Sequence, residues 1–219
     1  MRNFTASEEN YIKAIYHLEM IHGKVSTSLL SGEVQTSPAS VTDMLKKLQS
    51  KHLVHYKPYR GFNLTETGNK TALDIIRKHR LWEYFLVNKL GFQWDKVHEV
   101  AEDLEHISSK ELIIRLAAYL GNPLFDPHGD PIPDNKGKIK LLKQSSLALV
   151  PIKQTVTVSS VKNQSFEMLD LLKHYNIAIG SKIKVQRKFE FDGSVEIKVE
   201  KNAATVISND VAINVYCLL

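Results

Sequence analysis

Cysteine and long apolar runs are almost absent from this 219-residue sequence, and each absence excludes a class of protein. Cys217 is the only cysteine, so no disulfide can form within one chain and no site can be built from several thiolates. We therefore expect a cytoplasmic location, where thiols stay reduced. No stretch approaches the roughly 18 uninterrupted apolar residues of a transmembrane helix, so no membrane partner is expected. The first residues turn acidic at Glu8 and Glu9, where a signal peptide would need an apolar segment.

A strong excess of one charge is also missing. The chain has 29 Lys and Arg against 24 Asp and Glu, and its formal net charge of +5 suits a polyanionic partner without identifying one. Hydrophobic residues make up 43% and charged residues 24%, which is ordinary for a globular protein and excludes disorder of the whole chain. A chain of this length can form one large domain or several small ones.

Prolines and a change of hydrophobic period divide the chain into regions. Four prolines between Gly121 and Asn135 exclude regular helix and central strand there, after a region of long helical patterns. Polar and apolar residues alternate over 182–187 and 194–199, which predicts strands, and a helix is expected near 165–175. The predicted organisation is a first domain at 1–66, a helical domain at 67–135, a basic linker at 136–148 and a small β-barrel at 149–219.

The first part of the chain has the pattern of a helix-turn-helix. Ser7 is the expected N-cap of a helix that ends at Gly23, and a short second helix is expected from Ser26. Ser37 followed by Pro38 predicts the capped start of the next helix, because proline lacks an N–H that the first helical turn leaves unpaired. A short helix, a turn and a capped polar helix are typical of a DNA-reading helix-turn-helix.

A cationic hairpin follows this pattern. Strand-like runs at 53–56 and 62–65 flank a turn with Lys57 and Arg60, as in a wing that contacts phosphates or the minor groove. A helical domain whose exposed hairpin contacts proteins is the alternative. The candidate DNA contacts lie at the start of the third helix, on its outer face and in the wing, and they are Ser37, Ala39, Ser40, Thr42, Asp43, Lys46, Lys47, Lys57 and Arg60.

Two expected helices carry side chains that suit a metal ion. In the helix at 71–90, His79 and Glu83 are four residues apart and therefore share a face, which is otherwise apolar. Burying an imidazole and a carboxylate there costs free energy unless a partner such as a divalent cation satisfies them. The helix at 95–107 places its histidines and acids on one stripe, formed by His98, Glu102, Glu105 and His106. Clustered carboxylates repel one another, and a cation relieves the repulsion.

The donor atoms of this set indicate which metals fit. Imidazole nitrogens and carboxylate oxygens favour Mn²⁺ or Fe²⁺ over a tetrahedral thiolate zinc site. We expect Zn²⁺, Co²⁺ or Ni²⁺ to substitute in vitro, because intrinsic affinity does not favour manganese. A surface ion pair or a hydrogen-bonded core histidine is the alternative for each His–Glu pair.

The sequence resembles the diphtheria toxin repressor and manganese transport regulator family of metal-dependent transcription regulators. The resemblance covers residues 1 to about 135 and is carried by ENYI at 9–12, SVT at 40–42, YRG at 59–61, RKHR at 77–80, VH at 97–98, EHIS at 105–108 and DPHGDPIP at 126–133. The C-terminal part resembles more weakly the SH3-like, FeoA-type module of longer members. The resemblance implies a mainly α fold with small β parts, comprising a winged helix-turn-helix, a helical metal-binding and dimerisation domain and an SH3-like β-barrel. It also implies a homodimer, whose two-fold symmetry predicts a palindromic operator.

The resemblance further implies two metal sites. Its ancillary site corresponds to His79, Glu83 and His98, with further ligands from the C-terminal module that could be Glu167 and Gln164. Its regulatory site corresponds to Asn10, Glu102, Glu105 and His106. Glu102 agrees with manganese-type members, whereas Asn10 and Lys13 replace an aspartate and a glutamate of that type. These replacements disfavour a binuclear manganese site and leave the choice between manganese and iron open, with Glu102 favouring manganese.

Two other functions fit parts of the pattern. One is a winged-helix regulator that responds to an organic ligand or a protein partner and holds a structural metal or none. A metallohydrolase using Glu105 and His106 is disfavoured, because the chain has neither an HExxH helix nor a nucleophile motif, and no enzyme activity is expected. The apolar cluster of Leu81, Trp82, Phe85 and Leu86 fits a dimer face as well as the core of a single chain.

Overall fold

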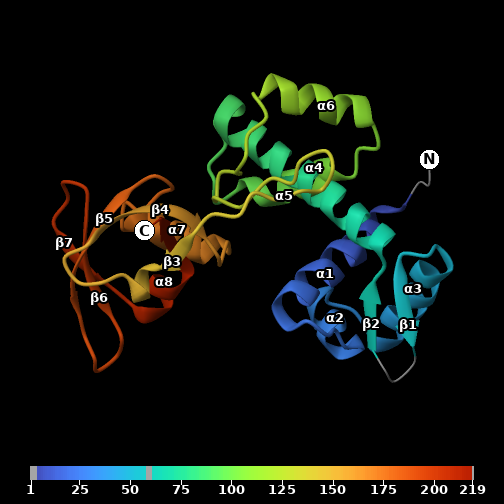
Figure 1. Cartoon of the computed structure of the whole chain (residues 1–219), viewed down its shortest axis with the longest axis horizontal. Helices are drawn as coiled ribbons and strands as arrows, with labels where there is room; N and C mark the ends of the chain where they lie inside the picture. The colour runs from blue at the N-terminus through green and yellow to red at the C-terminus, as the bar shows by residue number, and fades with distance from the viewer. Residues whose placement is uncertain (1–3, 58–60, 219) are drawn as a thin grey trace. The chain divides into compact units, whose positions relative to one another are not determined.

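The computed structural model describes residues 4–57 and 61–218. The chain divides into two compact units (Figure 1). One unit comprises Met1–His79, Glu102–Leu116 and Pro133–Lys138, and the other comprises Arg80–Ala101, Ala117–Ile132 and Ile139–Leu219. Within the described ranges, no helix has the length and apolar content needed to cross a membrane.

The first unit contains a winged helix-turn-helix. Its elements are α1 (Ala6–His22), α2 (Thr27–Glu33), α3 (Pro38–Ser50) and the antiparallel hairpin of β1 (Val54–Lys57) and β2 (Gly61–Leu64). Fully buried side chains from all three helices form its core, among them Ile12, Ile15, Leu30, Leu45 and Leu48. The predicted helix-turn-helix and its hairpin are therefore both present.

Capping side chains fix where these helices begin. Ser37 caps α3 as predicted, and Ser26, where a short helix was expected to start, caps α2. The prediction for the first helix was wrong, because its N-cap is Thr5 and not Ser7. The Thr5 hydroxyl accepts a hydrogen bond from the Glu8 N–H, and the Glu8 carboxylate accepts one from the Thr5 N–H. This capping box needs a glutamate three residues after the cap, and only Thr5 meets that condition.

Three further helices each contribute to both units, namely α4 (Glu66–Leu90), α5 (Val97–Glu105) and α6 (Lys110–Tyr119). α4 begins before the predicted residue 71, because the Thr65 hydroxyl accepts a hydrogen bond from the Gly68 N–H and satisfies the start of the helix. α5 is shorter than the predicted range of 95–107, so His106 lies just beyond its end. The proline-rich stretch that follows α6 forms no helix or strand, as predicted.

The second unit contains a six-stranded sheet in the order β3-β8-β4-β5-β6-β7, and each neighbouring pair is antiparallel. Its elements are β3 (Gln144–Ser146), the short 3-10 helix η1 (Leu147–Leu149), β4 (Thr155–Val161), α7 (Phe166–His174), β5 (Lys182–Lys188), β6 (Val195–Val199), β7 (Ala204–Ile207), α8 (Asn209–Asn214) and β8 (Val215–Leu218). The two alternating runs correspond to β5 and β6, and the expected helix corresponds to α7. The sheet begins within the predicted linker, because β3 pairs with β8.

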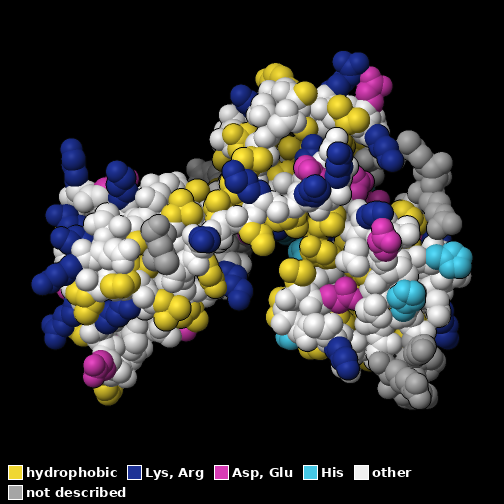
Figure 2. Space-filling model, in the orientation of Figure 1, with side chains coloured by type: hydrophobic (Ala, Val, Ile, Leu, Met, Phe, Trp, Pro, Cys, Tyr) yellow, Lys and Arg dark blue, Asp and Glu magenta, His cyan; other side chains and the backbone are white. Residues whose placement is uncertain are grey.

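The alternation along β5 separates a buried face from a basic one. Ile183 and Val185 are fully buried, whereas Lys182, Lys184 and Arg187 are exposed. Figure 2 shows Lys and Arg side chains gathered over this part of the sheet. The polar half of the period-two pattern therefore forms a cationic outer face.

Candidate metal centre

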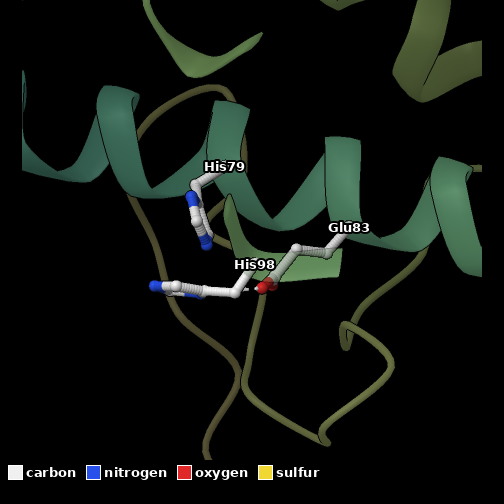
Figure 3. A group of neighbouring side chains, drawn as sticks. All are labelled: His79, Glu83 and His98. Carbon is white, nitrogen blue, oxygen red and sulfur yellow. Dashed lines mark hydrogen bonds and ion pairs between the residues drawn. The ribbon is translucent and has the colours of Figure 1, made fainter. Parts of the chain in front are cut away.

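Three of the predicted ligands lie together. His79 and Glu83 are one turn apart on α4, and His98 is the second residue of α5. One ligand atom from each lies within 4.8 Å of the others, and Figure 3 shows the Glu83 carboxylate next to His98. The His98 Nδ1 atom is 3.2 Å from Glu83 Oε1. His79 and Glu83 are buried and His98 is exposed. The group therefore combines a buried carboxylate with one buried and one exposed imidazole.

A second group shares Glu83 and was not predicted as a ligand set. It consists of Glu83, Asp126 and His128, all buried, again with ligand atoms within 4.8 Å of one another. His128 Nδ1 lies 3.8 Å from Glu83 Oε2 and 4.0 Å from Asp126 Oδ1. Sequence reasoning used the DPHGDPIP motif only as a mark of resemblance. The signal that could have identified these ligands is the spacing of Asp126 and His128, which lie two residues apart in a turn rich in proline and glycine.

Local backbone bonds hold Asp126 and His128 in this position. Asp126 Oδ1 accepts hydrogen bonds from the backbone N–H groups of His128 and Asp130, at 2.8 and 3.0 Å. The neighbouring Gly129 has φ of +87°, and a Cβ at this residue would lie 1.9 Å from the Ser159 carbonyl oxygen. Only glycine therefore allows the turn to approach β4 this closely.

The electrostatics of the second group favour a cation. His128 Nε2 lies 2.8 Å from the Trp94 carbonyl oxygen, which can only accept, so this nitrogen carries the proton. In the neutral ring Nδ1 then presents a lone pair to two carboxylates, and it has no hydrogen-bond partner among the described residues. Burial, then the charges of Glu83 and Asp130, raise the pKa of Asp126 well above its usual value, although Arg80 opposes this. A divalent ion would satisfy the lone pair and remove the repulsion, and a histidine whose other nitrogen donates to a carbonyl is typical of metal ligands.

The predicted regulatory residues are engaged with side chains of the protein. Glu105 is fully buried, and its two oxygens contact His79 Nδ1 at 2.6 Å and Lys13 Nζ at 2.7 Å. Burial raises the pKa of Glu105, but the His79 hydrogen bond and the Lys13 charge outweigh it, so the pKa is lower than usual. Lys13 Nζ also contacts Glu102 Oε1 at 3.2 Å. A lysine ammonium thus lies where the two carboxylates converge, and these residues do not fit a binuclear metal site as they stand.

The other two members of that set come from different parts of the chain, because His106 follows Glu105 and Asn10 lies on α1. His106 Nδ1 is 2.6 Å from Glu9 Oε2, so its ring is held by α1. The Asn10 Oδ1 atom is buried and accepts no hydrogen bond from any described residue. An unsatisfied amide oxygen and a histidine are both suitable ligands for a single divalent ion.

The two residues expected from the C-terminal module belong to neither group. Gln164 Nε2 donates to Asp130 Oδ2 at 3.2 Å and to the Val161 carbonyl at 3.3 Å. Glu167 is exposed in the first turn of α7. Their role as metal ligands stays a prediction.

The candidate DNA contacts occupy the exposed side of α3. Ala39, Ser40, Asp43 and Lys46 are exposed, and Ser37 caps the helix through the Ser40 N–H. Thr42 donates to the Pro38 carbonyl, and Lys47 pairs with Glu8 at 3.2 Å. Lys57 ends β1, and Arg60 lies outside the described residues.

Three family profiles match successive parts of the chain. "Iron dependent repressor, N-terminal DNA binding domain" matches residues 3–62. "Iron dependent repressor, metal binding and dimerisation domain" matches 65–134, and "FeoA domain" matches 145–218. The fold class inferred from the sequence is thereby confirmed.

Individual relatives agree with these profiles. The iron-dependent repressor IdeR of Mycobacterium tuberculosis is 32% identical over 133 residues, and the diphtheria toxin repressor of Corynebacterium efficiens is 31% identical over 133. Each match covers 61% of this chain and 58% of the relative, which is less than two thirds of its length. A solved manganese-dependent transcriptional repressor in complex with manganese is 32% identical, with a TM-score of 0.85 and coverage of 96% of this chain and 99% of that chain. The chain therefore belongs to the diphtheria toxin repressor and manganese transport regulator family of metal-dependent transcription regulators.

Proposed function

We propose that this protein is a transcriptional repressor that binds operator DNA as a homodimer when it holds Mn²⁺ or Fe²⁺, and that it controls genes of metal homeostasis. The family is one of DNA-binding repressors and not of enzymes. The prediction of a cytoplasmic location belongs with this function, because a bacterial-type repressor acts where its DNA is.

The observation that carries the proposal is the buried His128 Nδ1 atom, which faces Glu83 and Asp126 at 3.8 and 4.0 Å and has no hydrogen-bond partner among the described residues. A metal held by these residues, with His79 and His98 also grouped around the shared Glu83, would add positive charge to a buried set in which Arg80 already pairs with Asp126. Oxygen and imidazole donors suit Mn²⁺ and Fe²⁺, and Zn²⁺, Co²⁺ or Ni²⁺ are expected to substitute in vitro. Asn10, Glu102, Glu105 and His106 form the second proposed position, and Glu167 and Gln164 are proposed to add ligands to the first.

On DNA, we assign reading of base edges to the start of α3. Ser37, Ala39, Ser40, Thr42 and Asp43 lie there, where the recognition helix of this fold enters the major groove. Lys46, Lys47, Lys57 and Arg60 are proposed to contact phosphates. Metal favours DNA binding only if it binds the DNA-competent arrangement more tightly, and DNA must then tighten metal binding by the same factor.

A metal titration with one shared ligand removed tests the proposal. The wild-type protein should bind promoter DNA nearest its gene about tenfold or more tightly with Mn²⁺ or anaerobic Fe²⁺ than with chelator. Glu83→Gln should lose bound metal, measured by elemental analysis after dialysis, together with this difference in DNA affinity. Asp103→Asn makes the same carboxylate-to-amide change at an exposed residue of α5 and should behave like the wild type. Equal DNA affinity of the wild type with and without chelator would refute the proposal and favour a regulator with another trigger.

A further inference from the structure

Lys13 is a cation that the chain itself places between two acids. Its Nζ atom lies 2.7 Å from Glu105 Oε1 and 3.2 Å from Glu102 Oε1. The Lys13 side chain is 13% exposed and that of Glu105 is fully buried, so solvent screens this contact little. The partners are 89 and 92 residues apart in sequence and join α1 to α5 within one unit.

The bonds of Glu105 leave no place for a metal beside Lys13. One carboxylate oxygen of Glu105 contacts His79 Nδ1, and the other contacts Lys13 Nζ. A divalent ion would approach the second oxygen to about 2.0–2.6 Å, where the ammonium of Lys13 already lies in hydrogen-bonding contact. Two cations at this distance repel strongly in a buried setting. Metal and ammonium therefore exclude each other at this oxygen.

Asn10 provides an independent sign of where a metal would bind. It lies three residues before Lys13 on α1, so the two side chains share a face of that helix. Its Oδ1 atom is buried and unsatisfied among the described residues, and buried amide oxygens are nearly always paired. Asn10 is the α1 member of the proposed second position, and we expect an ion at Glu102 and Glu105 to take this oxygen as a ligand once Lys13 withdraws. Helix α1 thus carries both the ammonium that would compete with a metal and an amide oxygen that could bind one.

We propose that Lys13 is a tethered competitor of metal at the Glu102–Glu105 pair. In the metal-free protein its ammonium balances the two carboxylates and connects α1 to α5. A divalent cation binds there only by displacing that ammonium, so Lys13 sets the metal concentration at which the second position fills. This role rests on the proposed function and adds a residue that determines the response threshold.

Removal of the charge tests the competitor. Lys13→Met should bind Mn²⁺ at one position about tenfold or more tightly than the wild type in equilibrium dialysis, because a neighbouring like charge shifts ion binding by that order. With chelator the same variant should unfold at a lower temperature, since the carboxylates lose their counter-charge, and added Mn²⁺ should raise that temperature more than in the wild type. Lys13→Arg keeps the charge and should retain the wild-type affinity. Lys13→Gln gives the same comparison with a polar side chain if Lys13→Met does not fold.

Two further variants serve as controls for Lys13→Met, namely the same change at another lysine and a double variant. Lys51 pairs with the buried carboxylate of Glu8, outside the proposed metal positions, so Lys51→Met should leave the Mn²⁺ affinity unchanged. Adding Glu102→Gln to Lys13→Met should restore stability in chelator. If wild type binds Mn²⁺ and Lys13→Met binds it no more tightly, the competitor role is wrong while the proposed function stands. Absence of binding of both Mn²⁺ and anaerobic Fe²⁺ by both proteins would overturn the two together.

Discussion

Glu8 shows how one buried carboxylate connects the first helix to the recognition helix. It is 0% exposed, and Oε1 pairs with Lys51 at 2.5 Å and Lys47 at 3.2 Å. Burial raises the pKa of Glu8, but the hydrogen bonds from Lys51, Thr5 and Lys47 outweigh it and lower the pKa to about 2. The other oxygen completes the capping box of α1. Glu8 therefore acts both as a cap and as a buried anion.

Replacing Glu8 by glutamine should separate these two roles. The amide oxygen of Gln can still accept from the Thr5 N–H, but the charge is lost. Because the folded pKa of about 2 lies below the ordinary 4.5, the charge stabilises the fold above about pH 4.5 and this contribution is lost as the pH falls towards about 2. We expect Glu8→Gln to lower the free energy of unfolding at pH 7 by about 2 kcal/mol, less than the full shift implies because Lys47 is half exposed.

Urea unfolding of the metal-free protein at pH 7 and between pH 4.5 and 2 measures this contribution. The difference between wild type and Glu8→Gln should shrink as the pH falls through that window. Glu33→Gln, at an exposed residue of α2, is the control and should show no such convergence. A difference that stays constant with pH would mean that Glu8 acts through its shape and not through its charge.

At the scale of elements, α3 and the wing should both contact DNA phosphates. Lys46 lies on the exposed side of α3, where Asp43 is its ion-pair partner at 3.3 Å. Arg60 belongs to the wing turn expected from the sequence and lies outside the described residues. Each phosphate contact adds about 0.9 to the slope of log affinity against log salt concentration. We expect Arg60→Ala and Lys46→Ala each to weaken binding to all DNA sequences and to flatten this slope.

Measuring DNA affinity over a series of salt concentrations tests these phosphate contacts. Lys201→Ala removes an exposed lysine that follows β6 in the C-terminal sheet and should leave the slope unchanged. An unchanged slope in Arg60→Ala would count against a wing that contacts phosphates.

At the scale of the whole molecule, the proposed function requires two copies of the chain. The matched profile of residues 65–134 describes a metal-binding and dimerisation domain. Leu81, Trp82 and Leu86, which the sequence allowed on a dimer face, are buried within the single chain. Apolar side chains that remain exposed lie instead on α6, where Ile114 is 65% and Tyr119 69% exposed. Of the cluster considered first, only Phe85 stays half-buried, so we expect the dimer face to draw on further residues.

A two-fold dimer should recognise a palindromic operator. The metal-loaded protein should bind two inverted half-sites whose centres are about 10 base pairs, or a multiple of that, apart. We expect a gel shift with two chains per DNA, and loss of tight binding when one half-site is reversed into a direct repeat. Full affinity for an isolated half-site, with one chain bound, would contradict this arrangement.

The local elements followed from short-range signals in the sequence. Ser37 and Pro38 fixed the start of α3, and alternating residues fixed β5 and β6, because caps and side-chain periods act over a few residues. The errors were local as well. A capping box moved the start of α1 to Thr5, and α5 ended before His106.

Local signals in the sequence predicted only part of the candidate metal site. The spacing of His79 and Glu83 placed two ligands on one helical face, since a helix turn fixes that relation. The expected stripe on α5 does not act as one group, because His98 pairs with Glu83, Glu105 with His79 and Lys13, and His106 with Glu9.

The sequence by itself determined the kinds of element, the family and the types of donor atom. Only the tertiary structure decided which donors meet. Asp126 and His128 reach Glu83 through a turn that Gly129 packs against β4, and Lys13 reaches Glu102 and Glu105 across some 90 residues of chain. Contacts of this kind depend on chain folding over long separations, where no local period or cap records which charge will face which.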